Sequence, residues 1–450
     1  GLGANAVDSI TTGDYNVGLG DGALTANTEG SINTAVGYNS LAANTTGSQN
    51  VAIGRNSLLL NTTAVANTGI GTSALSAVTT GGYNTAVGGD ALKTNTTAAN
   101  NTAVGYQALT ANTTGTGNNA FGKSSLDANT TGNYNVAIGD SALGAATTAV
   151  GNTAVGSAAM TSTTTGASNT AVGLEALNAN TTGANNTATG YKALYTNTTG
   201  LRNTAVGIEA LKSNTTGNNN IAIGGYALDS NTTADNNTAV GYSALDANTT
   251  GYSNTAIGKS AGAAITTGVQ NTYIGMSAGD AVVDGTNNVG VGFEALSADH
   301  GSGETAVGVR ALKVSTADNN TAVGYNSLTA NTTGSSNTAV GKDSLQANTT
   351  AINNTGIGRA ALYANTTGTA NTTVGAWSLD LNTTGDNNVA FGYTALTRAT
   401  TADNNTAIGS LSLQATTTGA NNTAVGYNSM FSNTTGIEGT AVGMNALDHN

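Results

Sequence analysis

The residues best suited to acid–base or metal chemistry are four acids and a histidine in one stretch of the sequence, Asp280, Asp284, Asp299, His300 and Glu304. Carboxylates and imidazole are side chains that bind cations or exchange protons near neutral pH. A polysaccharide-cleaving enzyme would need two such carboxylates at a defined separation. The sequence offers no second acidic cluster, and exposed charges need no partner. We therefore interpret these residues as solvated loop acids and predict no catalytic site, no metal site and no cofactor.

A second candidate site is a column of tyrosines that occupy the same position of a repeat. They are Tyr38, Tyr106, Tyr191, Tyr242, Tyr325, Tyr393 and Tyr427. Other repeats place Arg55, Lys123, Asp140 or Thr72 at this position, so we expect it to face solvent. Three roles stay open for the tyrosines: they cover a glycine corner, they contact another protomer, or they stack on a sugar.

The composition excludes several classes of protein. With no Cys, the chain has neither disulfides nor thiolate metal sites. Its 12 basic and 24 acidic residues give a net charge of −12, which disfavours nucleic-acid binding. No apolar run reaches the ~18 residues of a membrane span, so we expect no membrane insertion by this segment. The frequent glycines lack the pattern of a phosphate-binding loop, and the second histidine, His449, has no repeated partner.

The elements that must position these residues come from a repeat that fills the whole chain. A unit beginning Asn33-Thr34-Ala35-Val36-Gly37 recurs every 17 residues, apart from two 16-residue units before Asn320. We number its positions from that Asn. Position five is always Gly, position nine is usually Leu, and an Asn-Thr-Thr segment begins at position twelve. A unit this short cannot form a helix pair.

Each unit predicts one turn of a β-solenoid. Positions two to four, as in Val51-Ala52-Ile53, alternate with the period of a strand, and Gly at position five suits a corner that needs positive φ. We expect positions two, four and nine to form the core, and the Asn residues at positions one and twelve to stack as amide ladders. The predicted fold class is all-β: a parallel β-solenoid (β-roll) of about 26 coils with 17 residues per coil.

The Asn-Thr-Ala-Val-Gly motif resembles the head repeats of YadA-like trimeric autotransporter adhesins and the repeat shafts of phage tail fibres. The resemblance extends over essentially the whole chain. It implies a parallel β-roll that trimerises laterally. It also implies an extracellular location, on a cell surface or a virion.

We expect residues 1–450 to form a single repeat domain with irregular coils at 255–320, where the coil cross-section changes and the rod bends. Position three is nearly always Ala or Gly, and the strand alternation places it opposite positions two and four. If positions two and four face the core, a flat, uncharged face remains for self-association. We therefore predict a homotrimer or filament with Ala35, Ala103, Ala171 and Ala339 near the contact.

These features predict a non-enzymatic structural protein: an adhesin, a tail-fibre shaft or another extracellular filament. Its partners would be copies of itself and a cell-surface glycan or receptor. Regular rows of Thr leave an ice-binding β-solenoid as the alternative. A tailspike-like polysaccharide-degrading enzyme is a second alternative, which would require a carboxylate pair.

Overall fold

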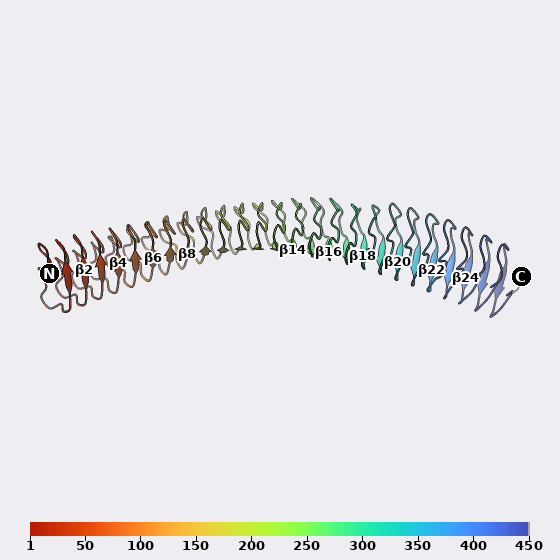
Figure 1. Ribbon diagram of the computed structural model, residues 1–450, viewed down its shortest axis with the longest axis horizontal. Coiled ribbons are helices and arrows are strands. Elements are labelled where there is room, and N and C mark those ends of the chain that lie inside the picture. Colours follow the sequence, from red (N-terminus) through yellow and green to blue (C-terminus); the bar gives the residue numbers. More distant parts are fainter. Residues whose placement is uncertain (449–450) are drawn as a thin grey trace. The chain divides into compact units, whose positions relative to one another are not determined.

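The structure is a computed structural model that describes residues 1–448 (Figure 1). Its strands have three residues each, and no helix occurs among the described residues. The chain winds as a parallel β-solenoid with one strand per coil, as the repeat predicts. None of the described residues belongs to a helix long and apolar enough to cross a membrane. His449 lies outside the described residues.

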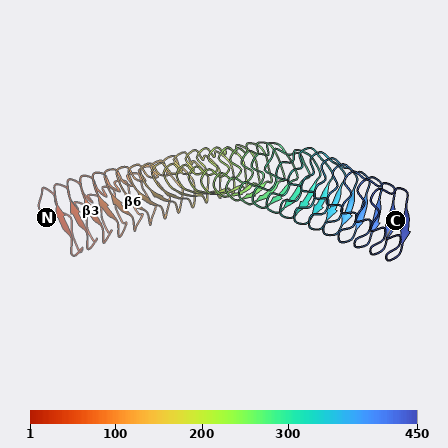
Figure 2. The same cartoon turned by 45° about the vertical axis from the view of Figure 1, so that its right-hand side comes forward.

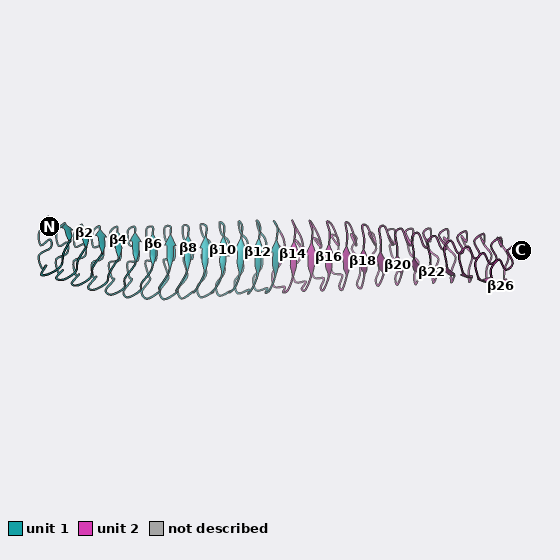
Figure 3. Ribbon diagram, turned by 90° about the horizontal axis from the view of Figure 1, so that it is seen from below, with its two compact units in different colours: residues 1–226 teal, residues 227–450 magenta. Residues whose placement is uncertain are grey.

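The structure comprises two compact units built from the same coil (Figure 3). The first unit is Gly1–Tyr226. Its strands are β1 (Val17–Leu19), β2 (Thr34–Val36), β3 (Val51–Ile53), β4 (Thr68–Ile70), β5 (Thr85–Val87), β6 (Thr102–Val104), β7 (Asn119–Phe121), β8 (Val136–Ile138), β9 (Thr153–Val155), β10 (Thr170–Val172), β11 (Thr187–Thr189), β12 (Thr204–Val206) and β13 (Ile221–Ile223).

The second unit begins at Ala227. Its strands are β14 (Thr238–Val240), β15 (Thr255–Ile257), β16 (Thr272–Ile274), β17 (Val289–Val291), β18 (Thr305–Val307), β19 (Thr321–Val323), β20 (Thr338–Val340), β21 (Thr355–Ile357), β22 (Thr372–Val374), β23 (Val389–Phe391), β24 (Thr406–Ile408), β25 (Thr423–Val425) and β26 (Thr440–Val442).

Within each unit, every strand pairs in parallel with the strand of the next coil (Figure 2). Thr34 pairs with Val51, and Ala35 pairs with Ala52, so equivalent positions lie side by side. The 16-residue coils keep this register, because Val289 pairs with Thr305 and Thr305 with Thr321. The missing residue is therefore absorbed outside the strands, and the ladder passes through residues 255–320 unbroken. A bend there stays a prediction.

The interior of each coil is narrow and mixed in polarity. In the coil of residues 33–49, the inward positions are one, three, eight, nine, twelve and fifteen, occupied by Asn33, Ala35, Ser40, Leu41, Asn44 and Gly47. The leucine at position nine is the largest of these side chains and is fully buried in coil after coil. This confirms the predicted leucine anchor.

The prediction for the two strand faces is wrong. Ala35, Ala103, Ala171 and Ala339 all have no exposed surface, whereas the residues at positions two and four face outward and are partly exposed. The interior opposite the strand is filled by leucine, which leaves room for only a small side chain at position three. The Ala column is therefore part of the core and is not available for contact with another copy.

Two asparagine ladders run through the interior, as expected. In the first ladder, the backbone N–H of Asn50 donates to Oδ1 of Asn33 at 3.0 Å. In the second, Nδ2 of Asn61 donates to Oδ1 of Asn44, also at 3.0 Å. Buried amides are stable only when they are hydrogen-bonded, and stacking similar coils gives successive Asn residues equivalent partners. The second ladder is interrupted where position twelve is not Asn, so Oδ1 of Asn129 and Oδ1 of Asn248 have no hydrogen-bond partner. The ladders therefore link each coil to its neighbours.

The corner after the strand has an unusual backbone. Gly37 at position five has φ of 131°, and a Cβ added there would lie 2.7 Å from the carbonyl oxygen of Gly54 in the next coil. Only glycine fits this position, as predicted. The corner also holds Asn39 and Leu41 at φ of 52° and 54°, a left-handed conformation that is uncommon for leucine. The side chain of Leu41 points into the core from this strained backbone.

Candidate functional site

The irregular coils enclose an interior cluster around Tyr273, which occupies position three of its coil. Gly262 and Gly279 replace the position-nine leucines of two successive coils, and the next coil carries Gly290 at position three. A Cβ added at Gly290 would lie 2.9 Å from the Tyr273 ring. The tyrosine is completely buried and occupies the space that the leucines would fill. The sequence also offers Ile265 and the Val282-Val283 pair to refill the core, and the structure buries Ile265 and Val282 but leaves Val283 40% exposed.

His300 and Glu304 lie in the same interior, which corrects their interpretation as solvated acids and bases. His300 is 3% exposed, and its Nε2 lies 3.4 Å from the hydroxyl oxygen of Tyr273. Nδ1 of His300 lies 3.1 Å from the carbonyl oxygen of Gly301, so Nδ1 carries the proton of the neutral ring and Nε2 accepts from the tyrosine. Burial lowers the pKa of His300, and it also raises the pKa of Tyr273.

Glu304 takes the place of an asparagine in the first ladder. Its backbone N–H donates to Oδ1 of Asn288 at 2.9 Å, and its Oε1 accepts from Nδ2 of Asn320 at 3.0 Å. Oε2 is buried with no hydrogen-bond partner. Burial raises the pKa of Glu304 to about 8, so the carboxyl is neutral at pH 7. A neutral acid can substitute for an amide in the ladder.

This interior cluster does not form a reactive site open to solvent. Tyr273, His300 and Glu304 are all buried, while Asp299 is exposed and accepts from the backbone N–H of Val283 at 3.0 Å. Within residues 1–448, no group of three or more His, Asp or Glu side chains is placed to hold a metal ion. The cluster therefore fills the core in the coils where the repeat is irregular.

The outward strand face is the most regular exposed surface. Position two is Thr in most coils, and position four is Val, Ile or another apolar residue in nearly all. Ile138 is 42% exposed, Val172 is 38% and Ile223 is 40%. None of the 26 strands carries a charged residue at either outward position. Contiguous apolar surface of this kind marks an interaction site in most soluble proteins.

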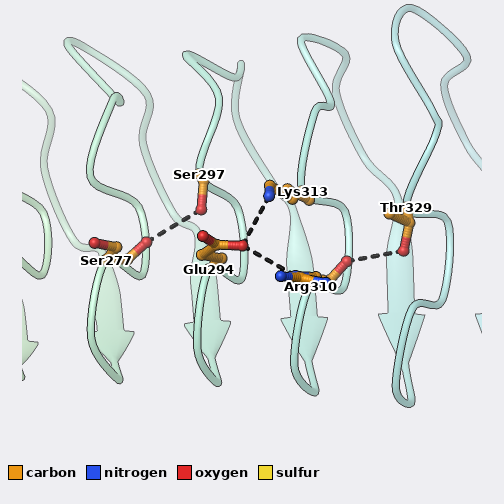
Figure 4. Close-up of polar contacts among 6 residues, drawn as sticks. All are labelled: Ser277, Glu294, Ser297, Arg310, Lys313 and Thr329. Atoms are coloured by element: carbon orange, nitrogen blue, oxygen red, sulfur yellow. Dashed lines mark hydrogen bonds and ion pairs between the residues drawn. The ribbon is translucent and has the colours of Figure 1, made fainter.

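Many of the charges lie instead along the corner formed by positions six, seven and ten, which we call the corner ridge. Glu294 accepts there from Nζ of Lys313 at 2.7 Å and from Nε of Arg310 at 3.1 Å (Figure 4). The hydrogen bonds to Lys313 and Arg310 lower the pKa of Glu294. The hydroxyl of Ser297 donates to the backbone carbonyl of Ser277, and the hydroxyl of Thr329 donates to that of Arg310. Each of these bonds joins two adjacent coils.

The tyrosine column belongs to the corner ridge and faces solvent, as expected. Tyr38 is 52% exposed, and the remaining members range from 40% at Tyr191 to 54% at Tyr242 and Tyr393, with Tyr106, Tyr325 and Tyr427 between these values. Two members lie under cations: Nζ of Lys192 is 5.2 Å from the Tyr191 ring, and Nζ of Lys342 is 5.6 Å from that of Tyr325. The column therefore offers aromatic surface interspersed with charge.

Sequence reasoning missed one further feature of the corner ridge, a pocket beside Trp377. Its volume is about 330 Å³, and Tyr363 and Asp380 contribute to its wall. The signal in the sequence was the single Trp of the chain, at a position that most other repeats fill with small or polar residues. No protein-family model matches the chain, and neither does any curated protein sequence.

Proposed function

We propose that this protein is a non-enzymatic structural component of an extracellular fibre on a cell surface or virion, in which copies of the chain pack laterally through the outward strand face. The observation that carries the proposal is the uncharged face of positions two and four, repeated in coil after coil. A second copy is the occupant that matches this face, because it repeats with the same spacing at every coil. The face itself carries no charged side chain, so no like charges would meet directly across the contact.

The size of the face is sufficient for a specific interface. Strands are spaced by ~4.8 Å and three residues extend ~10 Å, so the thirteen strands of one unit present roughly 600 Å². Burying this area on two chains removes roughly 1,200 Å², which is the lower end of specific protein interfaces. β-branched side chains lose little rotamer freedom on contact, which favours packing of such faces.

The test is the mass of the assembly in solution. We expect light scattering at micromolar concentration to give a multiple of the 43.8 kDa chain, with three copies as the stoichiometry that the trimeric-adhesin resemblance implies. The double variant Ile138→Glu/Val172→Glu places charges on the strand face and should dissociate the assembly while circular dichroism stays unchanged. A monomeric mass for the unmodified chain would refute the proposal.

The matched control places the same charges on the corner ridge. Leu174 and Ile208 are 49% and 45% exposed and occupy position six of their coils, away from the strand face. The variant Leu174→Glu/Ile208→Glu removes comparable apolar surface and adds the same charge, so it should leave the assembly intact. Equal dissociation by both double variants would show that net charge, and not the strand face, controls association.

Ice binding is the second candidate, because the same face carries outward Thr hydroxyls in rows about 4.8 Å apart. This activity requires a free face, whereas the fibre buries it. A monomeric chain that shows thermal hysteresis, lost in Ile138→Glu/Val172→Glu, would favour ice binding over the fibre.

A further inference from the structure

The pocket on the corner ridge of the second unit combines aromatic, acidic and basic side chains from three successive coils. These coils begin at Asn337, Asn354 and Asn371. Asp343, Ala360 and Trp377 occupy position seven of the three coils, so they stack in one column. Because the alanine between the two larger side chains ends at Cβ, the column is hollowed at its centre.

Trp377 is fixed in place by both neighbouring coils. The guanidinium carbon of Arg359 lies 5.0 Å from the centre of the Trp377 ring. The Tyr393 ring contacts it edge-to-face, with 5.7 Å between centroids and an interplanar angle of 85°. Such contacts hold an aromatic ring in one orientation. The pocket wall is therefore preorganised, and a ligand need not order it on binding.

The other walls supply exposed apolar surface and free hydrogen-bonding capacity. Tyr363 and Leu381 are 42% and 46% exposed. Asp380 is half-buried, and it lines the pocket. A carboxylate accepts hydrogen bonds from ligand hydroxyls. Arg359 complements the carboxylates, because its guanidinium donates hydrogen bonds and does not accept them.

We propose that this pocket binds a neutral pyranose sugar residue. The apolar C–H face of a sugar ring packs against aromatic and aliphatic side chains, its hydroxyls donate to Asp380 and Asp343, and other hydroxyl oxygens accept from Arg359. A volume of about 330 Å³ is at the small end of ligand pockets and suits one ring. The proposal is independent of the fibre, because the pocket lies on the corner ridge and not on the strand face.

An organic cation is the competing ligand for a pocket with aromatic rings and carboxylates. Arg359 argues against it, because its guanidinium already lies over the Trp377 ring, where a ligand cation would bind, and would repel a second positive charge. A neutral ring with several hydroxyls uses the acids and the arginine together.

Trp377 is the single tryptophan of the sequence, so the tryptophan fluorescence of the protein reports on this pocket. We would titrate the unmodified chain with methyl α-D-glucopyranoside, methyl β-D-galactopyranoside and methyl α-D-mannopyranoside. Sorbitol, which has hydroxyls but no ring, is the control solute. At least one pyranoside should change the fluorescence saturably, whereas sorbitol should not. No saturable change with any of the three would overturn the proposal.

Variants on two walls of the pocket test where the sugar binds. Asp380→Asn removes the carboxylate with little change in shape, and Tyr363→Ala removes aromatic surface; each should weaken binding at least 10-fold. Tyr427→Ala, on a 53% exposed tyrosine of the same ridge, should bind as the unmodified chain does. Unchanged binding in both pocket variants would contradict the assignment, and so would saturation by tetramethylammonium in place of the sugars. The outcome does not depend on assembly, because Ile138→Glu/Val172→Glu should bind the same sugar.

Discussion

The side-chain amides of Asn33 and Asn44 donate to the same oxygen, the backbone carbonyl of Gly47, each at 2.9 Å. The two asparagines are eleven positions apart in the repeat and belong to different ladders. Their shared acceptor joins the two ladders inside every regular coil, as it does for Asn101 and Asn112 at Gly115. Where both positions are Asn, the polar part of the core is thus a connected network.

The network predicts that Asn112→Asp is strongly destabilising. Nδ2 of Asn112 donates to Oδ1 of Asn95 at 2.9 Å and to the Gly115 carbonyl at 3.0 Å. An ionised Asp would oppose two acceptors in a buried site, and a protonated Asp could donate only one of the two hydrogen bonds that Asn112 makes. We expect a loss of about 2–4 kcal/mol in the free energy of unfolding, measured by chemical denaturation.

The neighbouring Thr114 provides the control for this change. It is exposed at position fourteen, where the chain itself carries Glu29 and Asp284 in other coils. Thr114→Asp should change the free energy of unfolding by less than about 0.5 kcal/mol. A similar loss in the two variants would mean that the ladder contributes little.

The packing of Tyr273 predicts a compensating pair of substitutions. Tyr273→Ala should leave a cavity and reduce the free energy of unfolding by about 3–5 kcal/mol. Gly279→Leu alone should also destabilise, because its Cβ would collide with the Tyr273 ring. The double variant restores the common Ala at position three and Leu at position nine. Its loss of stability in thermal denaturation should be smaller than that of either single variant; simple addition of the two losses would contradict this packing.

The burial of Glu304 predicts that stability falls as pH rises. The pKa of its carboxyl is about 8 in the folded chain and about 4.3 when unfolded, so the folded state binds more protons between these values. The stabilisation is complete below pH 4.3 and is lost progressively as pH rises through about 8, by up to about 1.4 kcal/mol per pH unit. The measurement is hydrogen exchange at β17–β19, expressed as the ratio of the protection of the unmodified chain to that of Glu304→Gln at the same pH. This ratio should be smaller at pH 8 than at pH 5.5. An identical ratio at both pH values would show that Glu304 does not titrate in this window.

The fold could be predicted from the sequence because every coil repeats the same local rules. The glycine at position five, the leucine at position nine and the stacked asparagines each have one structural role. The faces of the strand could not be assigned from alternation alone, because alternation separates two faces without saying which one is inside. Hydrophobicity favoured Val36 over Ala35 as the core residue, but the narrow coil has space only for the smaller side chain.

The irregular interior and the pocket could not be predicted from the sequence, because both depend on the path of the chain. Glu304 looks like a loop acid until the one-residue-shorter coil places it in the asparagine ladder. Trp377 and Asp343 are two repeats apart, and their proximity depends on the side of the coil that position seven faces. The sequence spacing predicts that position-seven residues stack in one column. The depth of the pocket depends on the small side chain of Ala360 in that column.

The neighbour-to-neighbour character of the ladders has an evolutionary consequence. Because a coil bonds only to those beside it, unequal recombination can delete or duplicate one whole repeat and leave every remaining residue with an equivalent partner. Loss of a single residue is harder to absorb, and the shortened coils at 288–303 and 304–319 show one solution, in which the strand register is kept and Glu304 stands in for an amide. The length of this protein can thus change in steps of one coil without the loss of any class of core contact.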